Sequence, residues 1–112
     1  MSDHKLRNKY IPMTETAYYI LLSLVQPRHG YGIKQHVREL TGERLDIGAG
    51  TMYSTLSRME QDKLIIPVKE ENRRKIYQIS DKGKELLDAE VSRLKKLYEH
   101  GLDQLKGGNY NG

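Results

Sequence analysis

The sequence of 112 residues contains no cysteine, no tryptophan and no phenylalanine. The lack of cysteine excludes disulfide bonds, thiolate chemistry and zinc sites with thiolate ligands. The longest apolar run, residues 18–25, is interrupted by Ser23 and is too short to cross a bilayer. Residues 1–9 are polar and lack the apolar segment of a signal peptide, so we expect a cytoplasmic protein with no membrane partner.

Catalytic and metal-binding patterns are lacking too. The four histidines are scattered without the spacing of metal ligands. The glycines form neither a phosphate-binding loop nor the turn that carries a nucleophile in hydrolases. We therefore expect that the protein is not an enzyme and that it has no metal site and no cofactor.

What the sequence does have is a polar, weakly basic composition. Charged residues make up 30% of the chain, and 19 Lys and Arg against 15 Asp and Glu give a net charge of +4. This excess suits a polyanionic partner, either nucleic acid or an acidic membrane surface, but many ordinary domains are as basic. A chain of this length supports one domain, whose core stays marginal unless a partner subunit buries more surface. The positions of the charges therefore matter more than their number.

Apolar residues recur at helical spacing in three short segments of the first half of the chain. The first segment begins at Thr14, a typical N-cap residue, and ends before Pro27. The second is expected over residues 31–41 and the third over residues 50–62, with a short strand at residues 45–47 between them. The side chains expected in the core are Ala17, Ile20, Leu21, Leu24, Ile33, Val37, Leu40, Met52, Leu56 and Met59.

The period of the pattern then changes to two, which predicts strands at residues 64–69 and 75–79 joined by a polar turn. Ser80 is expected to cap a last helix, whose apolar stripe has the rhythm of a coiled-coil seam. This stripe extends further than one small domain can cover, which predicts a homodimer. The expected dimerisation residues are Leu87, Val91, Leu94, Leu97, Tyr98 and Leu105.

The predicted fold class is therefore mainly α with a small β-hairpin, a winged helix-turn-helix followed by a C-terminal dimerisation helix. Residues 14–80 are expected to form the DNA-binding domain and residues 81–105 the dimerisation helix. Residues 1–13 are interpreted as an arm or a short helix, and residues 106–112 as a disordered tail.

The third helix and the hairpin carry the candidate DNA-binding residues. With the apolar side of this helix in the core, its other face presents hydroxyls and an arginine that can bind phosphates or base edges. Three basic residues lie at or beside the hairpin turn; a solvated turn paired with Glu70 and Glu71 is the alternative interpretation. For Lys34, an ordinary surface charge is the simpler interpretation. The predicted DNA-binding residues are Thr51, Tyr53, Ser54, Thr55, Arg58, Arg73, Arg74, Lys75 and Lys34.

Three segments resemble the PadR family of bacterial repressors in their order and spacing. They are HGYGI at residues 29–33, GTMYSTLSRMEQDKLI at residues 50–65 and RRKIYQISDKGKELL at residues 73–87. The resemblance extends over about residues 14–98. Lys63 stands where glycine usually ends the recognition helix, and a lysine in a left-handed conformation costs about 1 kcal/mol.

The resemblance implies a winged-helix homodimer that binds double-stranded DNA and is joined by its C-terminal helix. It also implies release by a small molecule or by stress, as in several members of the family. The DNA-facing positions of the family correspond to Thr51, Tyr53, Ser54, Arg58, Arg73, Arg74 and Lys75. The chain is similar to the short branch of the family. Some members of that branch stack flat drugs between paired tryptophans, which this chain lacks.

A winged helix can also bind proteins instead of DNA, because fold alone does not fix function. A protein-docking surface would expose apolar residues, whereas the wing and the open face of the third helix are charged and polar. DNA binding is therefore favoured. Repression is favoured over activation, because so small a domain offers no obvious surface for recruiting a polymerase.

Overall fold

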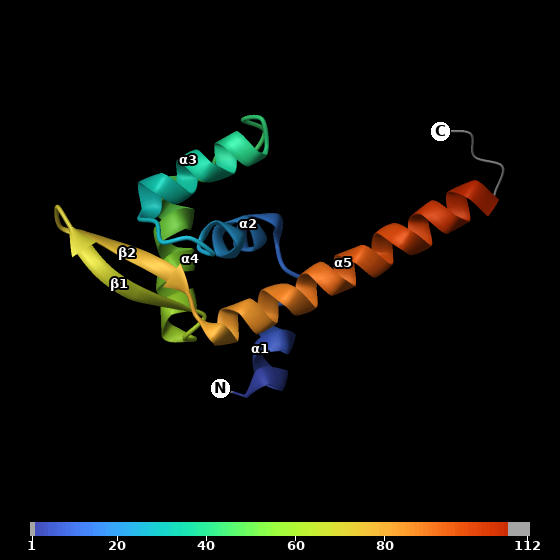
Figure 1. Ribbon diagram of the computed structural model, residues 1–112, viewed down its shortest axis with the longest axis horizontal. Coiled ribbons are helices and arrows are strands. Elements are labelled where there is room, and N and C mark those ends of the chain that lie inside the picture. The colour runs from blue at the N-terminus through green and yellow to red at the C-terminus, as the bar shows by residue number, and fades with distance from the viewer. Residues whose placement is uncertain (1, 108–112) are drawn as a thin grey trace.

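The computed structural model describes residues 2–107, which form five helices and one hairpin (Figure 1). This order of elements confirms the predicted winged helix-turn-helix followed by a long C-terminal helix. A short helix lies within the segment 1–13. The elements are α1 (Asp3–Tyr10), α2 (Glu15–Ser23), α3 (Gly30–Leu40), α4 (Ala49–Gln61), β1 (Ile65–Glu71), β2 (Arg74–Ile79) and α5 (Asp81–Gly107).

Side chains placed before the helices fix where they begin, because they accept hydrogen bonds from amides that have no partner within the helix. Thr14 before α2 and Ser80 before α5 each accept such a bond at 3.1 Å, as predicted. The His29 ring does the same for α3. The start of α4 differs, because Gly48 supplies no side-chain cap.

The core lies between α1, α2, α3 and α4, the base of the hairpin and the first turns of α5. The stripes predicted for the three helices are buried there, with one exception. Leu40 is 51% exposed, so its predicted burial is wrong. It is the last residue of α3, where the chain passes into an exposed loop. Helical spacing alone cannot show where a helix extends past its neighbours.

The hairpin formed by β1 and β2 is longer, and its turn tighter, than the sequence predicts. The strands pair in antiparallel fashion as far as Glu71 and Arg74, which leaves Asn72 and Arg73 as the turn. Both turn residues have positive φ, 51° and 65°, the conformation that closes a two-residue hairpin. The two basic residues that follow the turn are therefore held in β2.

A third segment pairs with the hairpin. The Arg28 amide donates to the Tyr77 carbonyl at 3.0 Å, and the Tyr77 amide donates to the Arg28 carbonyl at 2.9 Å. The strand predicted at residues 45–47 is not formed. That prediction is wrong because Arg28 already occupies the free edge of β2, while Ile47 buries its side chain from a loop.

The first turns of α5 are fixed on the body of the domain. A Cβ at Gly83 would collide with the backbone carbonyl of Leu64, so this close approach requires glycine. Leu86 and Leu87 then pack into the core. The Glu90 carboxylate, 2% exposed, accepts a hydrogen bond from the Met13 amide at 2.7 Å and pairs with a neighbouring arginine.

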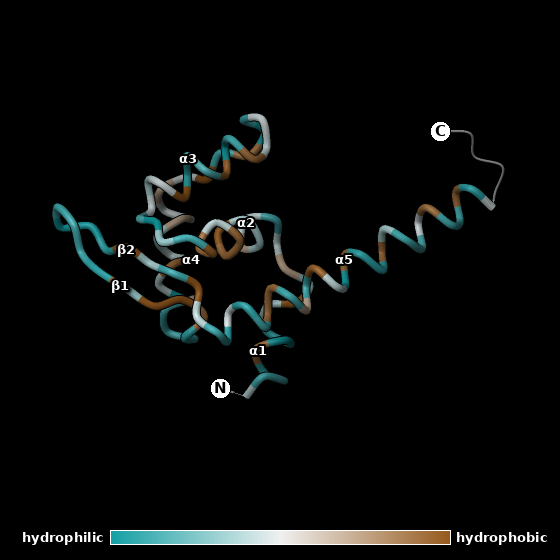
Figure 2. Tube along the Cα trace, in the orientation of Figure 1, coloured by the Kyte–Doolittle hydropathy of each residue, from teal (hydrophilic) through white to brown (hydrophobic). Residues whose placement is uncertain are grey.

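Beyond this point α5 projects away from the domain (Figure 1). Apolar residues recur along the projecting part, where the trace alternates between brown and teal (Figure 2). Lys106 and Gly107, predicted to begin a disordered tail, are the last residues of the helix, and the rest of that tail lies outside the described residues. No helix within residues 2–107 is both long enough and apolar enough to cross a membrane.

Candidate nucleic-acid interface

The exposed face of α4 carries four of the five residues predicted there. Thr51, Tyr53, Ser54 and Arg58 are exposed, and Tyr53 has 60% of its surface open. Thr55 is 5% exposed, so its predicted position on the outer face is wrong. It lies three residues after a core methionine, and the buried arc of α4 is wider than the stripe of apolar residues.

The wing presents its basic residues around the turn. Arg73, Arg74 and Lys75 are all exposed, and the outer end of the hairpin is hydrophilic (Figure 2). Arg73 occupies a left-handed turn position that favours glycine or asparagine. The chain thus keeps a guanidinium at the tip of the wing despite the cost in backbone strain.

Recognition helix and wing border the same cleft, which has a volume of about 300 Å³. Tyr53 contributes to it from α4, and the wing contributes its basic residues. The start of α3 closes the remaining side. The residues that line this cleft are His29, Gly30, Tyr53, Arg73, Arg74, Lys75 and Tyr77. Tyr53 of α4 and the basic residues of the wing therefore face the same cleft, whereas Thr51, Ser54 and Arg58 do not line it.

Glu60 of α4 holds the wing in place. The Tyr77 hydroxyl donates to Glu60 Oε1 at 3.2 Å, and Lys75 Nζ lies 3.7 Å from Glu60 Oε2. Burial, followed by the neighbouring Glu60 carboxylate, raises the pKa of Tyr77 to about 12. The phenol therefore remains a hydrogen-bond donor at neutral pH. Together with the backbone pairing to Arg28, these contacts fix the distance between the wing and α4.

The start of α3 borders this surface, although the sequence predicted only Lys34 of this helix as a DNA-binding residue. Gly30 lies beneath the Tyr53 ring, and Tyr31 is 57% exposed. Lys34, predicted to contact DNA, pairs with Asp46 at 3.2 Å. It borders a second, more apolar cleft of about 250 Å³ between α3 and α4. The signal that could have found this region is the glycine-rich HGYGI segment, since two glycines at a helix start indicate close contact with another element.

A polar cluster connects α1 to the end of α4, and sequence reasoning missed it as well. Lys9 Nζ lies 2.7 Å from Asp62 Oδ2, and the Tyr10 hydroxyl donates to the same oxygen at 2.6 Å. The guanidinium carbon of Arg58 lies 5.7 Å from the centre of the Tyr10 ring. Burial disfavours the Asp62 carboxylate, but the contacts with Lys9 and Tyr10 outweigh it and lower its pKa. No periodic signal in a short polar helix indicates such a cluster.

The predicted dimerisation residues on α5 fall into two groups, one buried and one exposed. Leu87 is 7% exposed and packs on its own domain, so its assignment to a dimer interface is wrong. It lies in the early turns of α5, which cover the core. The other five, all on the projecting part of the helix, are exposed: Val91, Leu94, Leu97, Tyr98 and Leu105.

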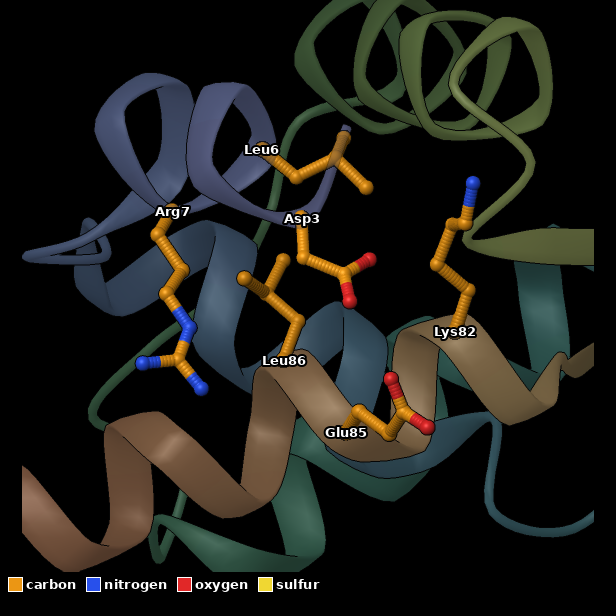
Figure 3. Close-up of a pocket in the computed structure, with 6 residues that line it drawn as sticks. All are labelled: Asp3, Leu6, Arg7, Lys82, Glu85 and Leu86. Atoms are coloured by element: carbon orange, nitrogen blue, oxygen red, sulfur yellow. The ribbon is translucent and has the colours of Figure 1, made fainter. Parts of the chain in front are cut away.

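A small pocket lies between α1 and α5 (Figure 3). Its volume is about 30 Å³, which is the size of a water molecule. Leu6 and Leu86 lie between the two helices, and charged side chains surround them (Figure 3). Within the described part of the chain, no group of three His, Asp or Glu side chains could hold a metal ion.

A polar α4 beside a basic wing is the arrangement found in winged helix-turn-helix transcriptional regulators. The fold and the site therefore place the protein in this class. Residues 20–89 match the PadR-like family of transcriptional regulators. The match covers more than half of the chain, and the chain belongs to this family of DNA-binding regulators.

A solved structure agrees with this assignment, and two further relatives are uncharacterised. The chain is 27% identical to a PadR-like transcription factor from Bacteroides fragilis, with a TM-score of 0.69, over 89% of this chain and 94% of that one. It is 30% identical to an uncharacterised protein X from Lysinibacillus sphaericus, over 73% of this chain and 84% of the relative. It is 34% identical over 63% of its length to an uncharacterised 37.1 kDa transposon protein from Streptomyces fradiae, of which the match spans 20%.

Proposed function

We propose that this protein is a sequence-specific transcriptional repressor that binds a roughly palindromic operator as a homodimer. The observation that carries the proposal is the cleft shared by Tyr53 of α4 and the basic wing residues. In a winged helix this arrangement lets α4 enter the major groove while the wing contacts the backbone or the minor groove. Such a protein acts in the cytoplasm, where it reaches the chromosome.

Each part of the surface has a separate task in this proposal. Thr51 and Ser54 are short enough to let α4 approach base edges or phosphates closely, and Arg58 can form a bidentate pair with guanine. Arg73, Arg74 and Lys75 neutralise phosphates, which strengthens binding to any sequence and makes it salt-dependent. Specificity therefore comes from α4 and general affinity from the wing.

The projecting part of α5 supports the homodimer. Its exposed apolar residues lie on one side of the helix, where a second copy would remove them from water. A two-fold dimer that places its recognition helices about 34 Å apart meets successive major grooves, so its operator repeats in inverted orientation. Repression is the simplest consequence of such binding, because a dimer bound at a promoter blocks access of the polymerase.

Release by a small molecule is the last part of the proposal, and the family resemblance is its support. The test uses the protein bound to its operator and extracts of cells grown under different stresses. We expect one extract fraction that lowers the affinity for DNA after proteins have been removed from it. If no fraction does so, this part of the proposal is wrong, while DNA binding is unaffected.

The central experiment compares two variants on a duplex selected by the wild-type protein from a random library and on a duplex of scrambled sequence. Replacing both Arg73 and Arg74 by alanine should weaken binding to both duplexes alike and flatten the dependence on salt. Arg58→Ala should also reduce discrimination between them, by about 1–3 kcal/mol if it pairs with a guanine. Equal effects of both variants on discrimination would contradict the proposed role of Arg58.

A further inference from the structure

We propose that Lys9 is a positioning residue for DNA recognition: it occupies the Asp62 carboxylate and thereby leaves Arg58 available to DNA. The proposal rests on the DNA-binding role of Arg58 described above. It extends the recognition surface to α1, which contributes no residue to the cleft between α4 and the wing.

Asp62 needs a positive partner. Its side chain is 8% exposed, and a carboxylate withdrawn from water is costly unless it is paired or hydrogen-bonded. Arg58 precedes it by four residues on the same face of α4, the spacing at which opposite charges pair along a helix. The chain thus offers Asp62 a local partner that would be held close to the helix surface.

In the structure Lys9 takes that place. Its ammonium lies 2.7 Å from Asp62 Oδ2, whereas Arg58, although exposed and close enough to favour the Asp62 charge, makes no ion pair within residues 2–107. The lysine comes from α1. Because α1 neutralises Asp62, the charge of Arg58 remains directed to solvent and available for a phosphate or a guanine.

Tyr10 completes the arrangement. Its side chain is buried, its hydroxyl donates to Asp62 Oδ2, and the guanidinium of Arg58 lies over its ring. A guanidinium on an aromatic face keeps its N–H donors directed outward from its edge. Tyr10 therefore restricts where Arg58 lies and takes up part of its hydrogen-bonding capacity, since Arg58 also interacts with the Tyr10 hydroxyl. The remaining N–H groups of the guanidinium are left for recognition. Lys9 and Tyr10 act together because both are anchored on the same carboxylate oxygen.

The test is a double-mutant cycle between Lys9 and Asp62, with binding measured on the selected and scrambled duplexes. Lys9→Met should weaken binding to the selected duplex about three- to tenfold, because Arg58 then pairs with Asp62, and should affect the scrambled duplex less. Adding Asp62→Asn should restore binding to within about twofold of the wild type, since asparagine still accepts from Tyr10 but does not attract Arg58.

Two controls keep the result interpretable. Lys5→Met removes an equal charge from an exposed position one turn earlier on α1, and it should change binding to both duplexes by the same small factor. Lys9→Arg retains the ion pair and should bind like the wild type. Thermal unfolding of every variant shows whether the fold is intact, and Lys9 is exposed enough for its loss to be tolerated.

The outcomes separate this proposal from the proposed function. If Lys9→Met weakens binding and Asp62→Asn does not restore it, Lys9 contacts a phosphate itself and the positioning role is wrong. If Arg58→Ala reduces discrimination but Lys9→Met has no effect, the positioning role is wrong while DNA recognition by Arg58 stands. If Arg58→Ala has no effect, both proposals for Arg58 fail.

Discussion

Tyr53 of α4 lies across Gly30 at the start of α3, so closely that a Cβ on Gly30 would come within 3.0 Å of the Tyr53 hydroxyl oxygen. This approach lets a large exposed side chain cross from one helix to the other. The tyrosine borders both the basic cleft beside the wing and the apolar cleft between α3 and α4. Its position on the proposed DNA-binding surface therefore depends on the absence of a side chain at position 30.

Gly30→Ala should displace Tyr53 and weaken operator binding. The added methyl group would lie 3.0–3.2 Å from the hydroxyl oxygen and two ring carbons of Tyr53, which is tighter than ordinary contact, and the exposed side chain can move away from it. We expect a loss of about 1 kcal/mol in DNA affinity, with little change in the melting temperature, because most of the ring is not packed in the core. Titration of the selected duplex and thermal unfolding measure the two effects.

Gly32→Ala provides the matched control on the same helix. A Cβ at this position would meet its neighbours at 3.6–3.8 Å, which is ordinary contact. Replacing a helical glycine by alanine should raise the stability by about 0.5–1 kcal/mol and leave DNA affinity unchanged. Equal losses of affinity from both variants would show that the conformation of α3, rather than the place of Tyr53, is what matters.

Arg73→Gly should separate stability from DNA binding at the wing. Arg73 has a φ of 65°, a conformation that glycine adopts without strain, so the variant should keep or gain stability by about 1 kcal/mol. Affinity for both duplexes should fall. The slope of log affinity against log salt concentration should also become shallower, by the amount that corresponds to about one phosphate contact. Asn72→Gly tests the neighbouring turn position without a change of charge, and it should leave affinity unchanged. A loss of affinity in both variants would instead point to the shape of the turn.

The sequence predicts most of the fold because the elements follow simple periods. The apolar spacing of α2, α3 and α4, and the caps at Thr14 and Ser80, locate the helices to within a few residues. The change of period to two locates the hairpin. Periodicity fails to predict the conformation of a segment when tertiary contacts determine it. Ile47 is apolar but lies in a loop, because Arg28 takes the strand position beside β2.

The candidate site is only partly predictable for a related reason. The apolar stripe of α4 predicts which of its residues lie on the outer face. The exception is Thr55, which lies at the edge of that stripe and is buried. The contacts between Tyr53 and Gly30, and between Lys9 and Asp62, join residues that are 23 and 53 positions apart in the chain. No local pattern encodes them, since they depend on how α1 and α3 pack on α4.

Leu94→Glu should dissociate the proposed homodimer. Leu94 lies on the exposed apolar side of α5, where a partner helix would surround the new carboxylate with apolar groups and leave it unpaired. Light scattering should show a dimer for the wild type and a monomer for the variant at micromolar concentration, and operator binding should weaken at least about tenfold because only one half-site is held. Ser92→Glu adds the same charge on the opposite, exposed face of α5 and should remain a dimer. A monomeric wild type would contradict the two-fold operator.

Glu90 should make the stability of the protein depend on acid pH. The bond from Arg93 lowers the pKa of Glu90 against the opposing effect of burial, and the Met13 amide lowers it further. Because the pKa is lower in the folded state than the ordinary value of 4.5, the ionised carboxylate stabilises the fold above about pH 4.5, and this stabilisation is lost as the pH falls through the folded value. Glu90→Gln should therefore destabilise the protein by about 1–3 kcal/mol at neutral pH.

The difference in unfolding free energy between wild type and Glu90→Gln should shrink as the pH falls below about 4.5, because the wild-type carboxyl then becomes neutral as well. Denaturant unfolding at a series of pH values measures it. Glu99→Gln replaces an exposed carboxylate further along α5 and should change the stability little at any pH. If the difference in unfolding free energy between wild type and Glu90→Gln instead stays constant into the acid range, the charge of Glu90 is not what stabilises the contact between α5 and the segment before α2. The shape of the side chain would then be responsible.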